Sequence, residues 1–524
     1  MGDPQRLTES RRIPADLPQS VGEIVSAVNA SRDSAPAPEP GARVLPLRRG
    51  PGVTVLSEES LAQIHEATLR VLEETGIEIG PGAMLERLEA AGAQGDAEAG
   101  RVRFPRSLVE EALRRPACDL VLAARDPACD LRLDGSAGWL SAGGGADAIV
   151  DLESGDRRSP TEKDLADVSR VADAVPQIGF LWQSVVALDV PATTRPLHEL
   201  HAQHANTSKH IQLTTATDAR QAEGAVEIAR IVAGGERQLR ERPGLSAFQR
   251  SRSPLAYEAA ALEAAVTFAE AGVPCGFVAT SVAGTSAPAT RAGRLVVSHA
   301  ELLAGVTALE LLVPDAPTFC GTRGGLVDPG TGEVSSGGLE DLLFHVASAE
   351  LAHRYDLPAH IGIFATGAKA PDWQAGLEEG LASFVSWLAG AEMVCAAGML
   401  HDARVFSLSE MLLDAELFDL VRTISLGFDV DEEAMAVEVI EKVGPAGHFL
   451  GEEHTLRHMR ESWLGKCMDT NTWEDWEEAG KPEPAGLARE RALELLSTHE
   501  PMPLAEGAEE RILEVIAEYE RDRG

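Results

Sequence analysis

Two groups of histidines have spacings that could bind a metal ion. The first group lies at three- to six-residue intervals and consists of His198, His201, His204 and His210. Residues three or four apart lie on one side of a helix, so these side chains could chelate zinc. The sequence has no HExxH motif and specifies no carboxylate partner for them. A metal-dependent barrel hydrolase stays open as an alternative function.

The second group consists of His448, His454 and His458. His454 and His458 are four residues apart, which is a ligand-like spacing and also suits a hydrogen-bonded helix start. The residues by themselves favour the structural interpretation. We therefore predict no resident metal ion.

A polar loop between an apolar run and the next helix could orient a substrate. It spans residues 364–376 and contains Lys369, Asp372 and Gln374. The same residues could instead cap the helix that starts near Asp372. The glycines of segment 141–146 could likewise approach a ligand through bare backbone or form a simple turn.

Four aromatic residues lie in or beside the ends of apolar runs. Aromatic faces hold methylated ammonium groups, and each contact contributes on the order of 0.5 to 2 kcal/mol. Core packing is the alternative for each of these residues, which are Trp182, Phe319, Phe364 and Trp373.

The elements that position these residues are short apolar runs separated by amphipathic helices. Such bounded, unalternating runs are typical of parallel strands covered on both faces. Seven runs are clear, and an eighth near His448–Leu450 would close the ring. The seven are Ile178–Val186, His210–Thr215, Leu245–Gln249, Cys275–Thr280, Thr318–Gly321, Ala359–Ala365 and Ala391–Ala396.

This pattern predicts an α/β fold, a (β/α)8 TIM-type barrel, with a doubly wound open sheet as the alternative. In such a barrel the active site lies in the loops that follow the strands. We expect a flexible arm over residues 1–50, an α+β cap over 51–160, the barrel over 161–451 and a helical extension over 452–524. The cap would include β-like segments at 120–123 and 139–141.

Composition excludes several classes of partner. The net charge of -37 opposes binding to nucleic acid or to anionic membranes and is compatible with a cationic substrate. The six cysteines form no CxxC pair, and the sequence has neither a signal-peptide pattern nor about 18 uninterrupted apolar residues. These observations favour a cytoplasmic protein.

Seven stretches, taken in order, resemble the trimethylamine methyltransferase (MttB-like) family over about residue 50 to the end of the chain. They are 156–165, 284–293, 300–305, 351–358, 369–376, 447–458 and 499–504. The resemblance implies a barrel enzyme that moves a methyl group from a methylated amine to the Co(I) cobalamin of a separate corrinoid protein. It also implies that the chain holds no cobalamin permanently, and we expect a homo-oligomer.

Some members of this family carry pyrrolysine near the strand that precedes the 369–376 loop. Here the corresponding stretch, Ile363–Thr366, contains only standard residues. The resemblance therefore implies the branch without pyrrolysine, whose substrates include betaines and related quaternary amines. A quaternary amine suits the reaction because its cleavage releases a neutral tertiary amine.

For a betaine, a cationic side chain should bind the carboxylate. From their placement after strands we predict Arg323 for this role, with Arg250 in reserve. Phe364 and Trp373 would face the methylammonium group, His345 would hydrogen-bond the substrate, and Lys369 and Gln374 would orient it. We expect His448, His454 and His458 at the rim of the active site or at the partner surface. A binder of methylated amines without catalytic activity is a further alternative.

Overall fold

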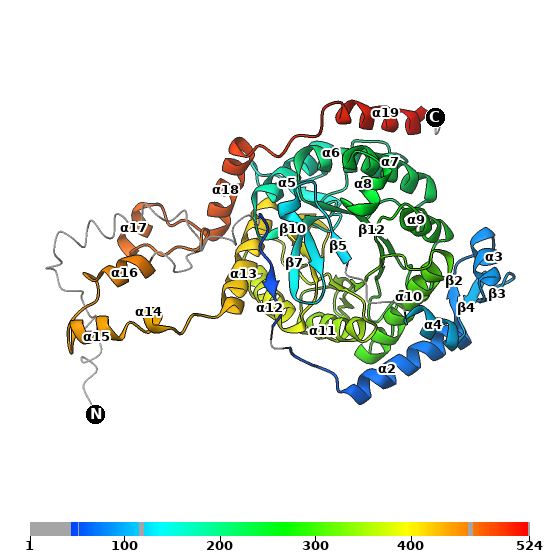
Figure 1. Cartoon of the computed structure of the whole chain (residues 1–524), viewed down its shortest axis with the longest axis horizontal. Helices are drawn as coiled ribbons and strands as arrows, with labels where there is room; N and C mark the ends of the chain where they lie inside the picture. Colours follow the sequence, from blue (N-terminus) through cyan, green and yellow to red (C-terminus); the bar gives the residue numbers. More distant parts are fainter. Residues whose placement is uncertain (1–42, 51, 115–119, 460–464, 522–524) are drawn as a thin grey trace.

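The computed structural model describes residues 43–50, 52–114, 120–459 and 465–521, and its centre is a closed barrel (Figure 1). Eight parallel strands follow one another around the ring, and the last pairs with the first. This confirms the predicted TIM-type barrel over the open sheet. The strands are β7 (Ala137–Ala142), β10 (Ile178–Leu181), β11 (His210–Leu213), β12 (Leu245–Arg250), β13 (Cys275–Ala279), β14 (Cys320–Thr322), β17 (Ala359–Ile361) and β18 (Met393–Ala397).

The strand that closes the barrel is β7, and the prediction of a closing strand at His448–Leu450 is wrong. Leu140 of β7 pairs with Val394 of β18, which leaves no edge to fill. Residues 448–450 are instead an exposed turn before a short helix. The segment 139–141, expected in the cap, is therefore the first barrel strand, and the barrel starts before residue 161.

A long helix follows each strand and covers the outside of the ring. Local signals explain several helix starts: Thr161 and Asp164 form a capping box, and Asp372 accepts hydrogen bonds from the amides of Gln374 and Ala375. The helices are α5 (Glu162–Ala174), α6 (Arg195–Asn206), α7 (Ala219–Ala233), α9 (Ala259–Glu270), α10 (Arg291–Leu312), α11 (Leu339–Arg354), α12 (Trp373–Ala389) and α13 (Leu408–Leu426).

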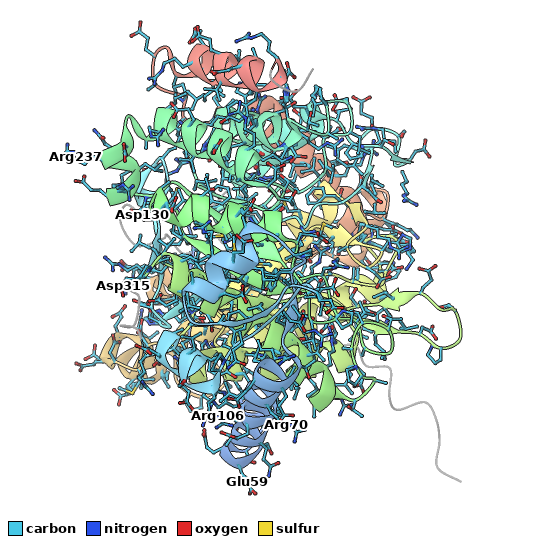
Figure 2. All side chains as sticks on the ribbon, turned by 90° about the vertical axis from the view of Figure 1, so that its right-hand side faces the viewer. Glu59, Arg70, Arg106, Asp130, Arg237 and Asp315 are labelled. Atoms are coloured by element: carbon cyan, nitrogen blue, oxygen red, sulfur yellow. The ribbon has the colours of Figure 1, made fainter. Side chains whose placement is uncertain are left out.

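Among the described residues, α10 is long and apolar enough to span a membrane by length and composition alone. Most of it is buried inside the protein, as expected for a core helix. It packs against α2 (Glu58–Arg70), which lies on the outside of the barrel (Figure 1). Figure 2 shows charged side chains such as Glu59 and Arg70 projecting outward from α2.

The two ends of the barrel differ. The hairpin of β5 (Leu120–Leu122) and β6 (Leu131–Leu133) packs its leucines against Trp139 and Phe180 and closes the end where the strands begin. At the opposite end, β8 (Ala148–Val150) and the short strands after β18 form a separate small sheet. The open end of the barrel is therefore the carboxyl end of the strands.

The chain after α13 leaves the barrel as an arm and then returns (Figure 1). We call residues 427–459 and 465–480 the C-terminal arm; it contains α14 (Glu432–Met435), α15 (Val437–Val443), α16 (Glu453–His458) and α17 (Trp473–Glu478). Helix α18 (Pro484–Thr498) then packs on α13 and α5, and α19 (Ala508–Arg521) packs on α6 and α7.

Candidate active site

Two arginines reach into the carboxyl end of the barrel from different strands. Side chains alternate along a strand; Phe248 and Gly321 face the interior, so Arg250 and Arg323, two residues further on, face it too. Arg323 Nη1 donates a hydrogen bond to the carbonyl of Gly144, at 3.0 Å. A methyl group built on Gly145 would lie 3.9 Å from Nη2 of Arg250. Both guanidinium groups therefore converge on the loop that follows β7.

The electrostatic environment of this arginine pair is unusual. Burial, together with the charge of Arg250, lowers the pKa of Arg323 to about 9, and burial lowers the pKa of Arg250. The side chain of Arg250 is nevertheless open to solvent at the barrel mouth. Within the described ranges, no carboxylate lies within ion-pair distance of either guanidinium group. The pair is therefore suited to binding an anionic group from outside the chain.

The loop between β7 and β8 can take its shape only with glycine. Gly143 has φ of +83°, and a Cβ there would lie 2.2 Å from Cα of Ser184. Gly145 also has a positive φ, +76°. The bare backbone brings the Gly144 carbonyl close enough to accept the hydrogen bond from Arg323. Segment 141–146 is thus a loop that follows a barrel strand and contacts Arg323, and its close approach to a ligand stays a prediction.

Aromatic rings form a buried layer inside the barrel. Trp182 stacks on His360 with ring centroids 4.9 Å apart, and the edge of Phe248 meets Trp182 at 5.2 Å. Trp182 also donates a hydrogen bond from Nε1 to Gln212, at 2.7 Å. Arg250 lies 5.7 Å from the centroid of Phe248, so this layer and the arginine pair belong to one site.

The sequence analysis did not predict His360 as part of the site. Its only signal in the sequence is that it is a polar residue within an apolar run. Burial, helped by the positive charges of Arg323 and Arg250, lowers its pKa to about 3. The imidazole is therefore neutral near pH 7. Neither ring nitrogen has a hydrogen-bond partner among the described residues.

Two of the predicted substrate contacts, Trp373 and His345, do not join Arg323. Phe364 is completely buried in the core, and Trp373 is 82% exposed at the first turn of α12. His345 lies outside the ring, because its Nδ1 is 3.1 Å from the hydroxyl of Thr322, whose side chain points away from the interior toward α11. The exposed position of Trp373 does not support the predicted gathering of Arg323, Phe364 and Trp373 around one cation, and the contact of Phe364 with a substrate stays a prediction.

The 369–376 loop caps the start of α12, which was the alternative to a role in orienting the substrate. Asp372 caps α12, and Gln374 Nε2 donates to Glu378 Oε1 at 3.0 Å. Lys369 is exposed, with Nζ 3.9 Å from a carboxylate oxygen of Asp402 and a hydrogen bond to the carbonyl of Gly367. The structure therefore gives Lys369 and Gln374 local partners on this loop.

The first histidine group holds helices together. His198 and His201 contact Glu162 of α5 at 3.8 and 3.9 Å, and His198 also contacts Glu520 of α19 at 3.0 Å. His204 is buried, and His210 bonds to the carbonyl of Ala123 and the hydroxyl of Ser246. In the part of the chain that the structure describes, these histidines do not converge on one point at metal-binding distances. The geometry gives no support to the metal-dependent hydrolase.

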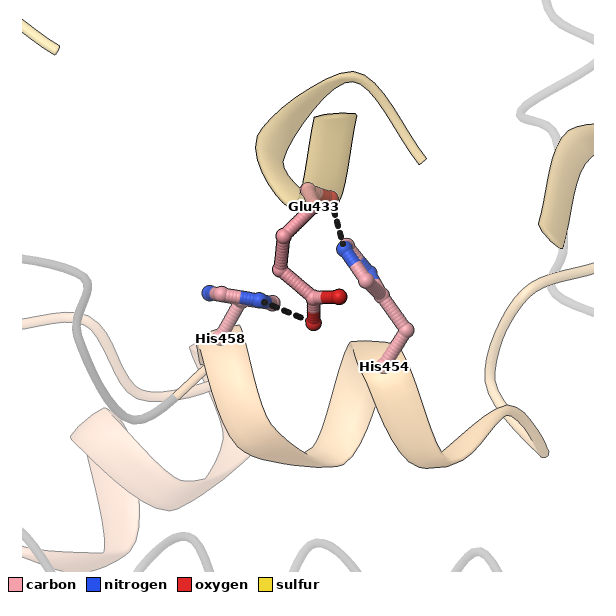
Figure 3. A group of neighbouring side chains, drawn as sticks. All are labelled: Glu433, His454 and His458. Atoms are coloured by element: carbon pink, nitrogen blue, oxygen red, sulfur yellow. Dashed lines mark hydrogen bonds and ion pairs between the residues drawn. The ribbon is translucent and has the colours of Figure 1, made fainter. Parts of the chain in front are cut away.

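The second histidine group lies on the C-terminal arm, which projects from the side of the barrel (Figure 1). His454 and His458 face Glu433 of α14, as Figure 3 shows. His448 is exposed in the preceding turn. None of the three lines the barrel interior together with Arg250 and Arg323.

Comparisons of the sequence with known proteins match this chain to one family. The family described as trimethylamine methyltransferase matches residues 27–524. The chain is 33% identical to trimethylamine methyltransferase MttB of Desulfitobacterium hafniense, over 91% of this chain and 96% of that protein. It is 31% identical to glycine betaine methyltransferase of the same species, over 90% of this chain and 98% of that protein. Among solved structures, the monomethylamine methyltransferase of Methanosarcina barkeri superposes with a TM-score of 0.49 at 10% identity, covering 92% of each chain.

Proposed function

The chain belongs to the trimethylamine methyltransferase family and is a methyltransferase, and from this premise we propose that it demethylates a quaternary amine that carries a carboxylate, a betaine. The acceptor in this proposal is the reduced corrinoid of a separate partner protein, which supplies the nucleophile. Since such an acceptor needs a reducing compartment, we place the protein in the cytoplasm.

The observation that carries the choice of substrate is the pair Arg250 and Arg323. Two guanidinium groups at the barrel mouth repel a ligand that is only a cation, such as a protonated amine or a tetraalkylammonium ion. They attract a carboxylate, and a guanidinium group can bind it with two parallel hydrogen bonds. A zwitterion is therefore the form of methylated amine that this site favours.

The same charges orient the ligand. When the carboxylate lies against the arginines, the quaternary nitrogen is pushed away from them, toward the opening of the barrel. The methyl groups then face the side from which a docked partner can reach them. Holding the reacting carbon in line with the nucleophile in this way is a large part of what an enzyme contributes to a displacement reaction.

No acid, base or nucleophile of the chain is required by this proposal. Cleavage of a quaternary ammonium group releases a neutral tertiary amine, so no proton has to move. His360, held neutral at the floor of the site, adds no further positive charge beneath the substrate. Alignment and exclusion of water are the tasks left to the protein.

Two measurements on the full chain test the proposal separately. Calorimetric titration with glycine betaine and with tetramethylammonium tests the ligand class, because the two differ by the carboxylate. We expect glycine betaine to bind at least about tenfold more tightly, as suits a charge-assisted contact of about 1.5 kcal/mol or more. Equal affinity would exclude the arginine pair as a carboxylate site.

Methyl transfer is followed by the absorbance change from Co(I) to methyl-Co(III), with chemically reduced cobalamin and then with corrinoid proteins as acceptor. Transfer from a betaine supports the proposal. Tight binding of betaines without transfer to any acceptor would favour the alternative, a binder of methylated amines without catalytic activity.

A further inference from the structure

A second site lies on the C-terminal arm, outside the barrel and independent of the proposed reaction. It consists of Glu433 from α14 and of His454 and His458 from α16 (Figure 3). The two histidines are one helical turn apart and therefore project from the same side of α16. Their ring centroids are 4.3 Å apart, and the Glu433 side chain lies beside both rings.

The distances among these groups approach those of a metal site. His458 Nε2 lies 3.4 Å from Glu433 Oε1, and His454 Nε2 lies 2.9 Å from the backbone carbonyl of Glu433. One ligand atom from each residue lies within 4.8 Å of the other two. Ligands at about 2.0 to 2.2 Å from a zinc ion are roughly 3 to 4 Å from one another. Side-chain rotations are needed to close the site, because His454 Nε2 contacts the backbone carbonyl of Glu433 and not its carboxylate.

The ligand set specifies the kind of ion. Two imidazoles and one carboxylate suit Zn²⁺ and similar divalent transition metals, whereas Mg²⁺ and Ca²⁺ prefer oxygen ligands alone. The three groups are exposed or half-buried, so water can complete the coordination. Arg457 competes for Glu433 Oε1 at 2.9 Å, but an exposed ion pair of this kind contributes at most about 1 kcal/mol and can be displaced.

In the described part of the arm, the four short helices have little packing to hold them in shape. Helices α14, α15, α16 and α17 contain no buried residue, and α14 and α16 are only 4 and 6 residues long. Helices this short are marginal in water without packing. A metal ion would join α14 to α16 across the intervening chain and supply order that a core cannot supply here.

We propose that Glu433, His454 and His458 bind one Zn²⁺-class ion, which fixes α14 against α16. On binding, His454 gives up its hydrogen bond to the Glu433 carbonyl, and its proton resides on Nδ1 while Nε2 binds the metal. The site would thereby set the conformation of the arm without touching the barrel mouth.

The test uses the full chain, purified without a polyhistidine tag and treated with EDTA, and titrated with ZnCl₂ by calorimetry at neutral pH. We expect one saturable site per chain. His458→Ala and Glu433→Gln should each weaken it by roughly a hundredfold or more, since each removes a direct ligand. His448→Ala is the matched control, an exposed histidine six residues before His454, and should bind as the wild type does.

A second readout separates ligation from general surface binding. Hydrogen exchange of residues 432–458 should slow on addition of Zn²⁺ in the wild type and in His448→Ala, and should not change in His458→Ala. The proposal is overturned if Zn²⁺ binds weakly at several sites in all variants, or if His458→Ala binds one ion as tightly as the wild type.

Discussion

Arg323 donates its hydrogen bond to Gly144 across the mouth of the barrel, from the end of β14 to the loop after β7, at 3.0 Å. These two residues are far apart both in sequence and around the ring of strands. Their contact fixes one guanidinium group over the barrel interior while its other nitrogens remain free of carboxylate partners among the described residues.

Arg323→Ala should weaken the binding of glycine betaine and leave that of tetramethylammonium unchanged or slightly tighter. A lost hydrogen bond to a charged group costs about 1.5 to 3 kcal/mol, which corresponds to roughly 10- to 150-fold in the dissociation constant. Calorimetric titration of both ligands measures the difference. Arg237→Ala, which removes an exposed charge on α8 (Glu236–Glu241), is the control and should change neither affinity. Equal losses for both ligands would contradict a carboxylate contact.

Gly143→Ala should lower both stability and betaine binding. The new Cβ would lie 2.2 Å from Cα of Ser184 and would force a positive φ on alanine, so the loop must move. We expect a cost of at least about 1 to 3 kcal/mol in the free energy of unfolding. Gly155→Ala is a matched control, because its φ is also positive, +77°, but no atom lies within 4 Å of the added Cβ. Thermal melts of both variants should show the larger loss for Gly143→Ala.

The contacts of His198 with Glu162 of α5 and with Glu520 of α19 should make the packing of α6 against these helices depend on pH. The hydrogen bond to Glu162 raises the pKa of His198, and hydrogen bonds to His198 and His201 lower the pKa of Glu162 to about 2. A raised histidine pKa stabilises the folded state below the unfolded value of about 6.5, and this contribution is lost as the pH rises through the folded value. The lowered pKa of Glu162 affects the stability of the folded state only in strong acid.

Glu162→Gln should therefore lower the melting temperature most near pH 5.5 to 6 and progressively less above pH 7. Melts of the wild type and the variant across this range test the trend. Glu59→Gln changes a carboxylate at the equivalent first turn of α2, where no histidine contact is found among the described residues, and should show no such dependence. A difference that stays constant with pH would contradict the histidine linkage.

Glu379, Glu410 and Asp414 form a buried group of carboxyls between α12 and α13, within 4.8 Å of one another. Burial raises the pKa of all three, and the charges of neighbouring carboxylates raise it further. Groups whose pKa is raised in the folded state bind more protons there than in the unfolded chain. These carboxyl groups therefore destabilise the folded protein least in acid. They destabilise it more as the pH rises above their pKa in the unfolded chain.

Glu379→Gln should stabilise the protein near pH 8, by on the order of 1 kcal/mol, because an amide can donate to both neighbours without a charge. The gain should shrink toward pH 5. Melts at the two pH values, with the exposed Glu490→Gln as control, measure it. A variant that is destabilised equally at both values would show that the carboxylate of Glu379 is required in its charged form.

Most of the barrel could be predicted from the sequence, because each predicted strand is a bounded apolar run between helices. The exception, β7, is explained by its surroundings: Trp139–Ser141 follows short irregular elements and precedes glycines, so it has the local pattern of a cap. Its partner β18 lies far along the chain, and only the closed ring identifies β7 as a barrel strand.

The site could be predicted in part, and the reason lies in side-chain direction. Arg250 and Arg323 could be predicted as site residues because the sequence shows that each of them follows a strand. Whether a residue two or three positions further on faces the barrel, the core or solvent depends on where the strand ends. Trp373 therefore lies on the surface, 82% exposed, although its type suits a methylammonium group.

The pairing of β7 with β18 determines when the barrel can close during synthesis of the chain. Leu140 must find Val394, nearly half of the chain away, before the ring is sealed. During synthesis, which starts at the N-terminus, the partly formed barrel therefore has unpaired edge strands until Ala397 has left the ribosome. During that interval the unpaired edge strands are open to pairing with other chains.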